Sequence, residues 1–162
     1  MAFLCVIVGV LLSVDNIEVV QIGVVNRDSP EEDEFDRSLV SRIVLKNEFA
    51  DGLKGIEEFS HVFIIYWLDR VPDSKKRLVV PLGSQKLAEQ VGVFATRMPI
   101  RPNPIGLSMV ELVKHERNTI WVRGLDALDG TPVLDIKPYP ECVKGQFIIA
   151  DKFKVPNWLR QA

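Results

Sequence analysis

The sequence contains few of the residues from which disulfides and metal centres are built. Its only cysteines are Cys5 and Cys142, which form no CxxC pair, and its only histidines are His61 and His115. Zinc sites need closely spaced Cys and His residues, and small secreted domains need several cysteine pairs. The composition therefore argues against a metal cluster and a disulfide scaffold, and it favours a reducing, cytosolic protein.

Long apolar runs are also scarce, and the one unusual segment is the N-terminal MAFLCVIVGVLLSV, residues 1–14. It is shorter than the roughly 18 residues of a membrane-spanning helix, and it lacks the basic start and cleavage pattern of a signal peptide. We expect residues 1–16 to be an extension that packs on the body of the protein or on a dimer partner. A start codon placed too early is an alternative, and a membrane anchor is a third.

The chain has no excess of positive charge, because its formal net charge is -2. A nucleic-acid partner would therefore have to meet a local basic patch. The densest basic cluster is Arg70, Lys75, Lys76 and Arg77. It is either a solvated loop or a rim that contacts phosphate. The acidic run at residues 31–34 is expected to be a solvated loop that repels phosphate.

Short β-branched and aromatic runs separated by turn residues indicate strands. The expected strands are 17–25, 41–45, 60–68, 78–82, 107–114, 119–125 and 131–136. Residues 60–68, SHVFIIYWL, form the buried core strand, and His115 lies in a hairpin turn. Pro138 and Pro140 end the last strand, and a short helix is one possibility for 84–90. Without a long amphipathic helix, this pattern predicts an all-β fold, a small antiparallel β-barrel with short helical turns.

The segment 92–111, GVFATRMPIRPNPIGLSMVE, is the most restrained part of the sequence. Each of its three prolines fixes its own φ angle and restrains the residue before it, so we expect a stiff loop between two apolar runs. The loop carries Arg97 and Arg101. It either holds an anion or another polar ligand, or is a rigid crossover with solvated arginines.

Several familiar catalytic motifs are absent from the sequence. It contains no GxGxxG after a strand, no GxxxxGK[ST], no HExxH and no GxSxG. The usual nucleotide cradles, zincin chemistry and serine-hydrolase chemistry therefore lack support. The stiff arginine loop, a histidine at a strand edge and an Asp-Gly turn remain, and they indicate only that the protein binds something polar.

Three longer blocks are more informative: DGLKGIEEFSHVFIIYWL (51–68), ATRMPIRPNPIGLS (95–108) and LDGTPVLDIKPY (128–139). In this order they resemble the TrmO-type tRNA methyltransferases, also called the TsaA-like or VirR-like family. With the IGVV strand, the resemblance covers residues 17–140. It implies that residues 17–142 form a β-barrel domain that binds S-adenosylmethionine, usually in a homodimer with sites near the subunit interface. Residues 143–162 would form a tail that packs on the barrel or the partner.

The resemblance also implies site residues. The implied cofactor contacts are His61, Arg97, Leu107, Leu128, Asp129, Gly130 and Thr131. A guanidinium group pairs with the methionine carboxylate, a glycine turn meets adenine edges, and a leucine packs on the ring. The candidates for the base that takes the amine proton, or for positioning the nucleobase, are Asp135, Lys137 and Tyr139. Arg101 and Lys137 are expected to meet phosphate or the threonyl carboxylate; a structural ion pair between Asp135 and Lys137 is the alternative.

The implied reaction is methylation of the exocyclic nitrogen of N6-threonylcarbamoyladenosine in tRNA, beside the anticodon, by a cytoplasmic enzyme. Because methyl transfer from a sulfonium is an in-line displacement, such an enzyme mainly needs proximity, orientation and a base. A module that senses S-adenosylmethionine without turnover is the alternative function. A membrane-tethered interaction protein is a third, and it depends only on residues 1–14.

Overall fold

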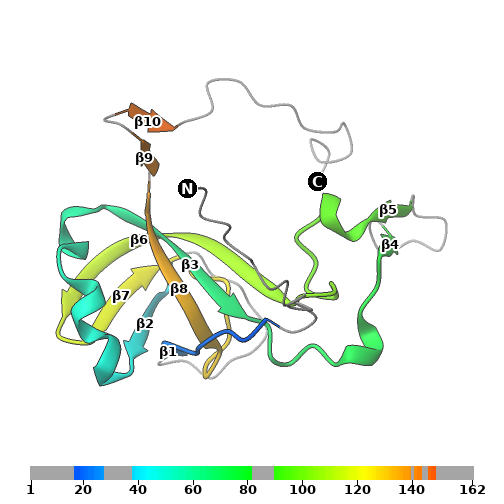
Figure 1. Ribbon diagram of the computed structural model, residues 1–162, viewed down its shortest axis with the longest axis horizontal. Coiled ribbons are helices and arrows are strands. Elements are labelled where there is room, and N and C mark those ends of the chain that lie inside the picture. The colour runs from blue at the N-terminus through cyan, green and yellow to red at the C-terminus, as the bar shows by residue number, and fades with distance from the viewer. Residues whose placement is uncertain (1–16, 28–37, 82–89, 140, 144–145, 149–162) are drawn as a thin grey trace, which may run out of the picture.

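The chain folds around a closed antiparallel barrel (Figure 1). The computed structural model describes residues 17–27, 38–81, 90–139, 141–143 and 146–148. Six strands form the barrel in the order β1-β2-β7-β6-β3-β8. Their bounds are β1 (Gly23–Asn26), β2 (Val40–Leu45), β3 (His61–Trp67), β6 (Ile105–Glu116), β7 (Thr119–Arg123) and β8 (Pro132–Tyr139). The expected all-β barrel is confirmed.

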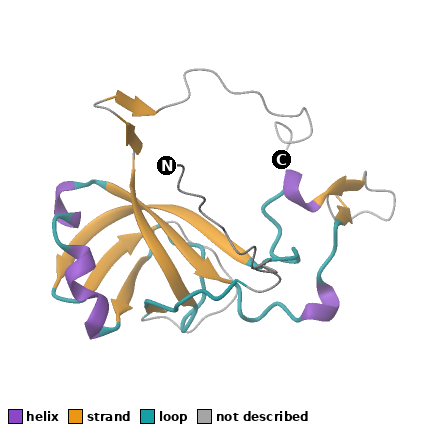
Figure 2. Cartoon of the chain, viewed as in Figure 1, coloured by secondary structure: helices purple, strands orange, loops and turns teal. Residues whose placement is uncertain are grey.

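Short elements connect and extend the barrel strands (Figure 2). Four 3₁₀ turns occur in the described residues: η1 (Asn47–Leu53), η2 (Ile56–Glu58), η3 (Asp73–Lys75) and η4 (Val93–Ala95). Two small antiparallel pairs complete the list, β4 (Val79–Pro81) with β5 (Gln90–Gly92), and β9 (Glu141–Val143) with β10 (Gln146–Ile148). The short helical turns expected beside the strands are thus present as 3₁₀ turns.

The barrel core is built from alternate residues of the strands. In β3, Val62, Ile64 and Tyr66 are buried, whereas the residues between them face outward and are half-buried. Ile43 and Ile120 from β2 and β7 join the same cluster. Each fully buried aliphatic side chain stabilises the fold by about 1.5–3 kcal/mol relative to an exposed one. The central strand expected at 60–68 is thus confirmed, with only one face in the core.

Two expected strand limits were wrong. The first strand begins at Gly23 rather than residue 17, because Gly23 pairs with Leu45, the last residue of β2. One further bond, from the amide of Lys46 to the carbonyl of Ile22 (2.9 Å), follows this pair. Among the described residues, 17–21 pair with no strand. The last barrel strand continues through Pro138, which pairs with β3, whereas β1 pairs only with the start of β8. At Pro138, the edge of β8 that faces away from β3 is therefore open within the part of the chain that is described. An open strand edge tolerates proline because no main-chain donor is needed there.

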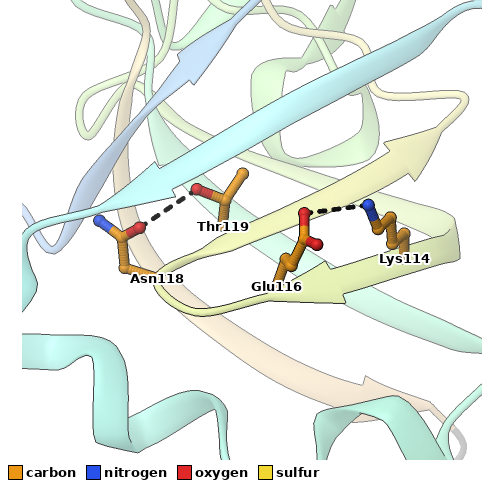
Figure 3. A network of polar contacts seen from close by, with 4 residues as sticks. All are labelled: Lys114, Glu116, Asn118 and Thr119. Carbon is orange, nitrogen blue, oxygen red and sulfur yellow. Dashed lines mark hydrogen bonds and ion pairs between the residues drawn. The ribbon is translucent and has the colours of Figure 1, made fainter.

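The hairpin of β6 and β7 is longer than expected, and Figure 3 shows Lys114 and Glu116 on the strand that leads to its turn. His115 lies between them in the sequence and is not a turn residue. It lies in β6, where Nδ1 is 3.2 Å from Oε2 of Glu57 and Nε2 is 2.9 Å from the carbonyl oxygen of Arg117. The turn begins at Arg117, whose φ is 56°. Asn118 fixes the turn by donating from Nδ2 to the carbonyl of Leu45 (2.7 Å).

An arm leaves the barrel between β3 and β6 and returns to it (Figure 1). The amide of Leu68 donates to the carbonyl of Pro104 at its base (2.7 Å), and the amide of Arg77 donates to the carbonyl of Ile100 farther out (2.9 Å). The proline-rich segment is therefore one side of this arm. The arm extends from the same end of the barrel as the turn before β8.

Other expectations concern parts of the chain that lie outside the described residues. These are the N-terminal extension, the acidic run at 31–34, nearly all of 84–90, and the tail beyond residue 148. In the described part of the chain, no helix is both long and apolar enough to cross a membrane. The same ranges hold no cluster of three His, Cys, Asp or Glu side chains that could hold a metal ion.

Candidate functional site

The three informative sequence blocks become neighbouring strands. In the middle strand β3, Ile65 pairs with Leu107 of β6 on one side and with Asp135 of β8 on the other. Side chains at these positions face outward, because the alternate residues of β3 fill the core. One outer face, which we call the β6-β3-β8 face, therefore carries five of the expected site residues. They are His61, Leu107, Asp135, Lys137 and Tyr139.

Arg97 lies at the arm end of this face, with most of its guanidinium group available. Because β7 pairs with β6 only from Glu111 onward, the edge of β6 before that point is open on this side. Arg97 uses it by donating from Nη1 to the carbonyl of Leu107 (3.0 Å). Its side chain is exposed, and its Nε and Nη2 atoms have no hydrogen-bond partner among the residues described. A planar guanidinium held in this way can still bind a carboxylate by two bonds.

The guanidinium group of Arg101, unlike that of Arg97, is bonded to several main-chain carbonyls of the arm. Its Nε donates to the carbonyl of Met98 (2.9 Å), and its Nη2 donates to the carbonyls of Val93 (3.1 Å) and Thr96 (2.6 Å). These bonds hold η4 and the arm segment that leads to Arg97. The substrate contact expected of Arg101 stays a prediction, and Nη1 is the atom left for it.

The LDGT turn lies between β7 and β8 at the same barrel end. Gly130 has a φ of 78°, a conformation that side chains other than glycine rarely adopt. The turn is attached to β1 by bonds between the amide of Gly130 and the carbonyl of Val25 (2.9 Å), and between the amide of Val25 and the carbonyl of Thr131 (3.0 Å). Leu128 closes it by accepting from the amide of Thr131 (3.2 Å).

Two arginines that the sequence analysis did not assign to the site hold this turn. The amide of Arg27 donates to Oδ1 of Asp129 (2.8 Å), and Nη2 of Arg70 donates to the carbonyl of Asp129 (3.1 Å). Arg70 belongs to the basic cluster noted in the sequence, but no sequence pattern links either arginine to the Asp-Gly turn. The side chain of Asp129 thus has a local structural partner.

His61 and Tyr139 lie at the other end of the face. They pair with each other across β3 and β8, and His61 also pairs with Glu111, four residues beyond Leu107 along β6. At about 3.4 Å per residue, four residues correspond to about 14 Å. Nδ1 of His61 is 3.0 Å from Oγ of Ser60. Within one chain the expected cofactor contacts therefore form two separate groups.

Asp135 lies level with Leu107, Lys137 lies two residues farther toward the His61 end, and the two side chains form an ion pair. Oδ2 of Asp135 is 2.8 Å from Nζ of Lys137, and Oδ1 accepts from the amide of Ile136 (2.9 Å). The hydrogen bond and the charge of Asp135 raise the pKa of Lys137. Lys137 is therefore a cation at neutral pH and suits the recognition of an anion better than proton abstraction. The structural ion pair considered from the sequence is present.

The β6-β3-β8 face is also apolar and partly uncovered. Along β6, the outward side chains of Ile105, Leu107, Met109 and Val113 are 40%, 43%, 53% and 43% exposed. Phe63 and Tyr139 pack edge to face beside them, with ring centroids 5.5 Å apart. Contiguous exposed apolar residues of this kind are typical of interaction surfaces.

A closed antiparallel barrel with an accessible arginine and a glycine turn at the same end defines a β-barrel protein that is suited to bind a small anionic or zwitterionic ligand. The family model "tRNA-methyltransferase O N-terminal domain" matches residues 24–143. The chain belongs to this family.

Individual relatives agree with this assignment. The chain is 50% identical over 112 residues to an S-adenosyl-L-methionine-binding protein of Archaeoglobus fulgidus, covering 69% of this chain and 77% of that protein. It is 46% identical over 99 residues to the tRNA (adenine(37)-N6)-methyltransferase of Mus musculus, covering 59% of this chain and 23% of that protein. A crystal structure of TrmO from Pseudomonas aeruginosa is similar with a TM-score of 0.64 and 32% identity, covering 86% of this chain and 61% of that one. The chain thus spans less than two thirds of the latter two proteins.

Proposed function

We propose that this protein is an S-adenosylmethionine-dependent tRNA methyltransferase that acts on the exocyclic nitrogen of N6-threonylcarbamoyladenosine beside the anticodon. The family membership and the names of the relatives support the cofactor and the class of reaction. The observation that carries the proposal is the arrangement of Arg97, which is held at one edge while the rest of its guanidinium group stays accessible.

The residues at the arm end fit the cofactor. Arg97 would bind the methionine carboxylate, the outward side chain of Leu107 would pack on a ring, and main-chain groups of the 128–131 turn would meet the adenine. The open space around Gly130, where an added Cβ would meet nothing within 4 Å, leaves room for a ligand close to the main chain. When bound, S-adenosylmethionine supplies an activated methyl group on a sulfonium sulfur.

Strand β8 offers groups for the substrate along the face, from Asp135 beside Leu107 to Tyr139 beside His61. Asp135 has a carboxylate that can accept the proton released from the substrate nitrogen, and Tyr139 offers a ring and a hydroxyl for positioning the base. Lys137, kept cationic by Asp135, would attract a phosphate or the threonyl carboxylate. Arg101 remains a candidate for the same task through Nη1.

We further propose that the active unit is a homodimer in which the two groups of site residues come from different subunits. His61 and Arg97 lie at opposite ends of one face, so a single chain does not bring them together. A two-fold axis across the exposed apolar residues of β6 would cover them and would bring the arm end of one subunit toward the His61 end of its partner.

Cofactor binding and turnover are tested separately. Isothermal titration of the full chain with S-adenosylmethionine should give saturable binding with one site per chain. Incubation with cofactor and tRNA that carries the threonylcarbamoyl group, followed by nucleoside mass spectrometry, should give a methylated nucleoside. The same tRNA without the threonylcarbamoyl group is the control and should give none. Binding without product under saturating cofactor would replace the enzyme by a sensor, and no binding would reject both.

The shared site is tested by mixing variants. At a cofactor concentration near the wild-type Kd, Arg97→Ala and His61→Ala should each retain little activity alone. If each site uses Arg97 of one subunit and His61 of the other, co-refolded mixtures should regain about a quarter of the wild-type activity, because half of the chains pair as heterodimers and each heterodimer holds one intact site. Light scattering should give twice the mass of one chain. A monomer, or mixtures as inactive as the separate variants, would reject the shared site.

A further inference from the structure

The hydroxyl of Tyr66 joins the two segments that carry the arm-end contacts. The side chain is 4% exposed and lies at the end of β3 nearest the arm. Its Oη donates to the carbonyl of Asp126 (2.5 Å) and lies 3.2 Å from Oγ of Ser108. Because the phenol has one hydrogen, which is used on the carbonyl, the hydroxyl of Ser108 is the donor in the second bond. A continuous chain of hydrogen bonds therefore runs from β6 to the loop before the LDGT turn.

A glycine fixes the position of the ring. Tyr66 pairs directly with Gly106 across β3 and β6, and a Cβ at Gly106 would lie 2.1 Å from Cε2 of the ring. The ring therefore rests on the main chain of β6 immediately before Leu107. Its hydroxyl is held against Ser108, immediately after Leu107. The two neighbours of Leu107 in the sequence are thus both in contact with one side chain.

The charges of Asp126 and Arg97 both act on this hydroxyl. Burial is the main cause that raises the pKa of Tyr66, the charge of Asp126 adds to it, and the bond from Ser108 and the charge of Arg97 lower it. The net shift is upward, so the phenol keeps its hydrogen at neutral pH. The bond to the carbonyl of Asp126 is therefore maintained under physiological conditions.

We infer that Tyr66 is a positioning residue of the cofactor site. Its hydroxyl sets the spacing between the Leu107 segment and the loop that leads into the 128–131 turn. Strand β3 pairs with β6 and with β8 from Val133 onward, and among the described residues it has no strand pairing with this loop or turn. The inference rests on the proposed function, because the cofactor is assigned there. Tyr66 faces the core and not the outer face, so it acts through Leu107 and the turn without touching the cofactor.

The test removes the hydroxyl and keeps the ring. Tyr66→Phe should raise the Kd for S-adenosylmethionine about tenfold, as expected when a buried hydrogen-bonded link is lost. Ser108→Ala removes one bond of the chain and should raise the Kd by about twofold to threefold. Thr119→Val removes a hydroxyl at the opposite end of the barrel, where Thr119 donates to Oδ1 of Asn118 (3.3 Å), and should leave the Kd unchanged.

A second measurement needs no cofactor. In hydrogen exchange of the unliganded chain, Tyr66→Phe should speed exchange at the amides of Gly130 and Thr131, which hold the turn, more than at the core amide of Ile64. A merely structural hydroxyl would speed exchange throughout the barrel and leave the Kd of the folded protein unchanged.

The outcomes separate the two proposals. If the wild-type chain does not bind S-adenosylmethionine, the proposed function fails, and the exchange data still decide whether Tyr66 positions the turn. If the wild type binds and Tyr66→Phe binds equally well, the inference is overturned while the proposed function stands. If Tyr66→Phe does not fold, the Kd of Ser108→Ala decides, and a value equal to that of the wild type overturns the inference.

Discussion

Replacing Arg97 by alanine should separate cofactor binding from stability. In the folded chain Arg97 makes one hydrogen bond, to the carbonyl of Leu107, from an exposed side chain. Its loss should cost about 1 kcal/mol of unfolding free energy or less. A hydrogen bond to a charged ligand group is worth about 1.5–3 kcal/mol. The Kd for S-adenosylmethionine should therefore rise about tenfold to a hundredfold, because each 1.4 kcal/mol corresponds to about a factor of ten.

Arg101→Ala provides the contrast. Its guanidinium group donates to three main-chain carbonyls from a half-buried position, so its removal should cost about 2 kcal/mol or more of unfolding free energy. Arg123→Ala, which removes an exposed ion pair with Glu111, is the matched control and should change neither quantity much. Urea denaturation and isothermal titration measure the two quantities. If Arg97→Ala lowers stability as much as Arg101→Ala and leaves the Kd unchanged, Arg97 belongs to the scaffold and the assignment is refuted.

Three further outcomes follow from the structure. Gly106→Ala should destabilise the chain by about 1–3 kcal/mol, because the added Cβ overlaps the ring of Tyr66. Gly52→Ala is the control: its Cβ meets open space, so its free energy of unfolding should stay within about 0.5 kcal/mol of the wild-type value. Equal urea midpoints for the two variants would contradict the overlap. The pKa of Tyr66 is raised, so its contribution to stability is complete below about pH 10 and is lost as the pH rises through the folded pKa. Urea midpoints above pH 10 should fall less in Tyr66→Phe. The pKa of Glu57 is lowered, first by a hydrogen bond from the amide of Glu57 itself and then by His115. Its contribution to stability is therefore present above about pH 4.3 and is lost as the pH falls through the folded pKa. His115→Gln should reduce that loss, and acid unfolding transitions identical to those of the wild type would refute this.

The barrel was predictable because its signals are local. The β-branched and aromatic run of β3 and the Asp-Gly turn before β8 are both visible in neighbouring residues. The adjacency of β6, β3 and β8 was not predictable from spacing, because it depends on which strands pair. The sequence blocks nevertheless identified the three strands that form the β6-β3-β8 face.

The errors share a different cause. Two of the errors, at the start of β1 and at Pro138 in β8, depend on where a partner strand ends. The third, the position of His115, depends on a side chain far away in the sequence. The end of β2 at Leu45 sets the start of β1 at Gly23, and Glu57 contacts His115 across 58 residues. The support of the LDGT turn by Arg27 has the same character. Tertiary partners, and not local propensity, decided each of these features.

The comparison of Arg97 with Arg101 explains why the site itself could not be read from the sequence. Both arginines lie in the same proline-rich segment, four residues apart, and the family resemblance suggested ligand contacts for both. They differ only in the acceptors that the fold brings to them: three arm carbonyls for Arg101, and one strand-edge carbonyl for Arg97. A guanidinium group already bonded on several sides gains little from a ligand, whereas one held at a single edge is oriented and still able to bind. The prolines therefore serve the site indirectly, by stiffening a loop in which one arginine braces the arm and the other is presented to the ligand.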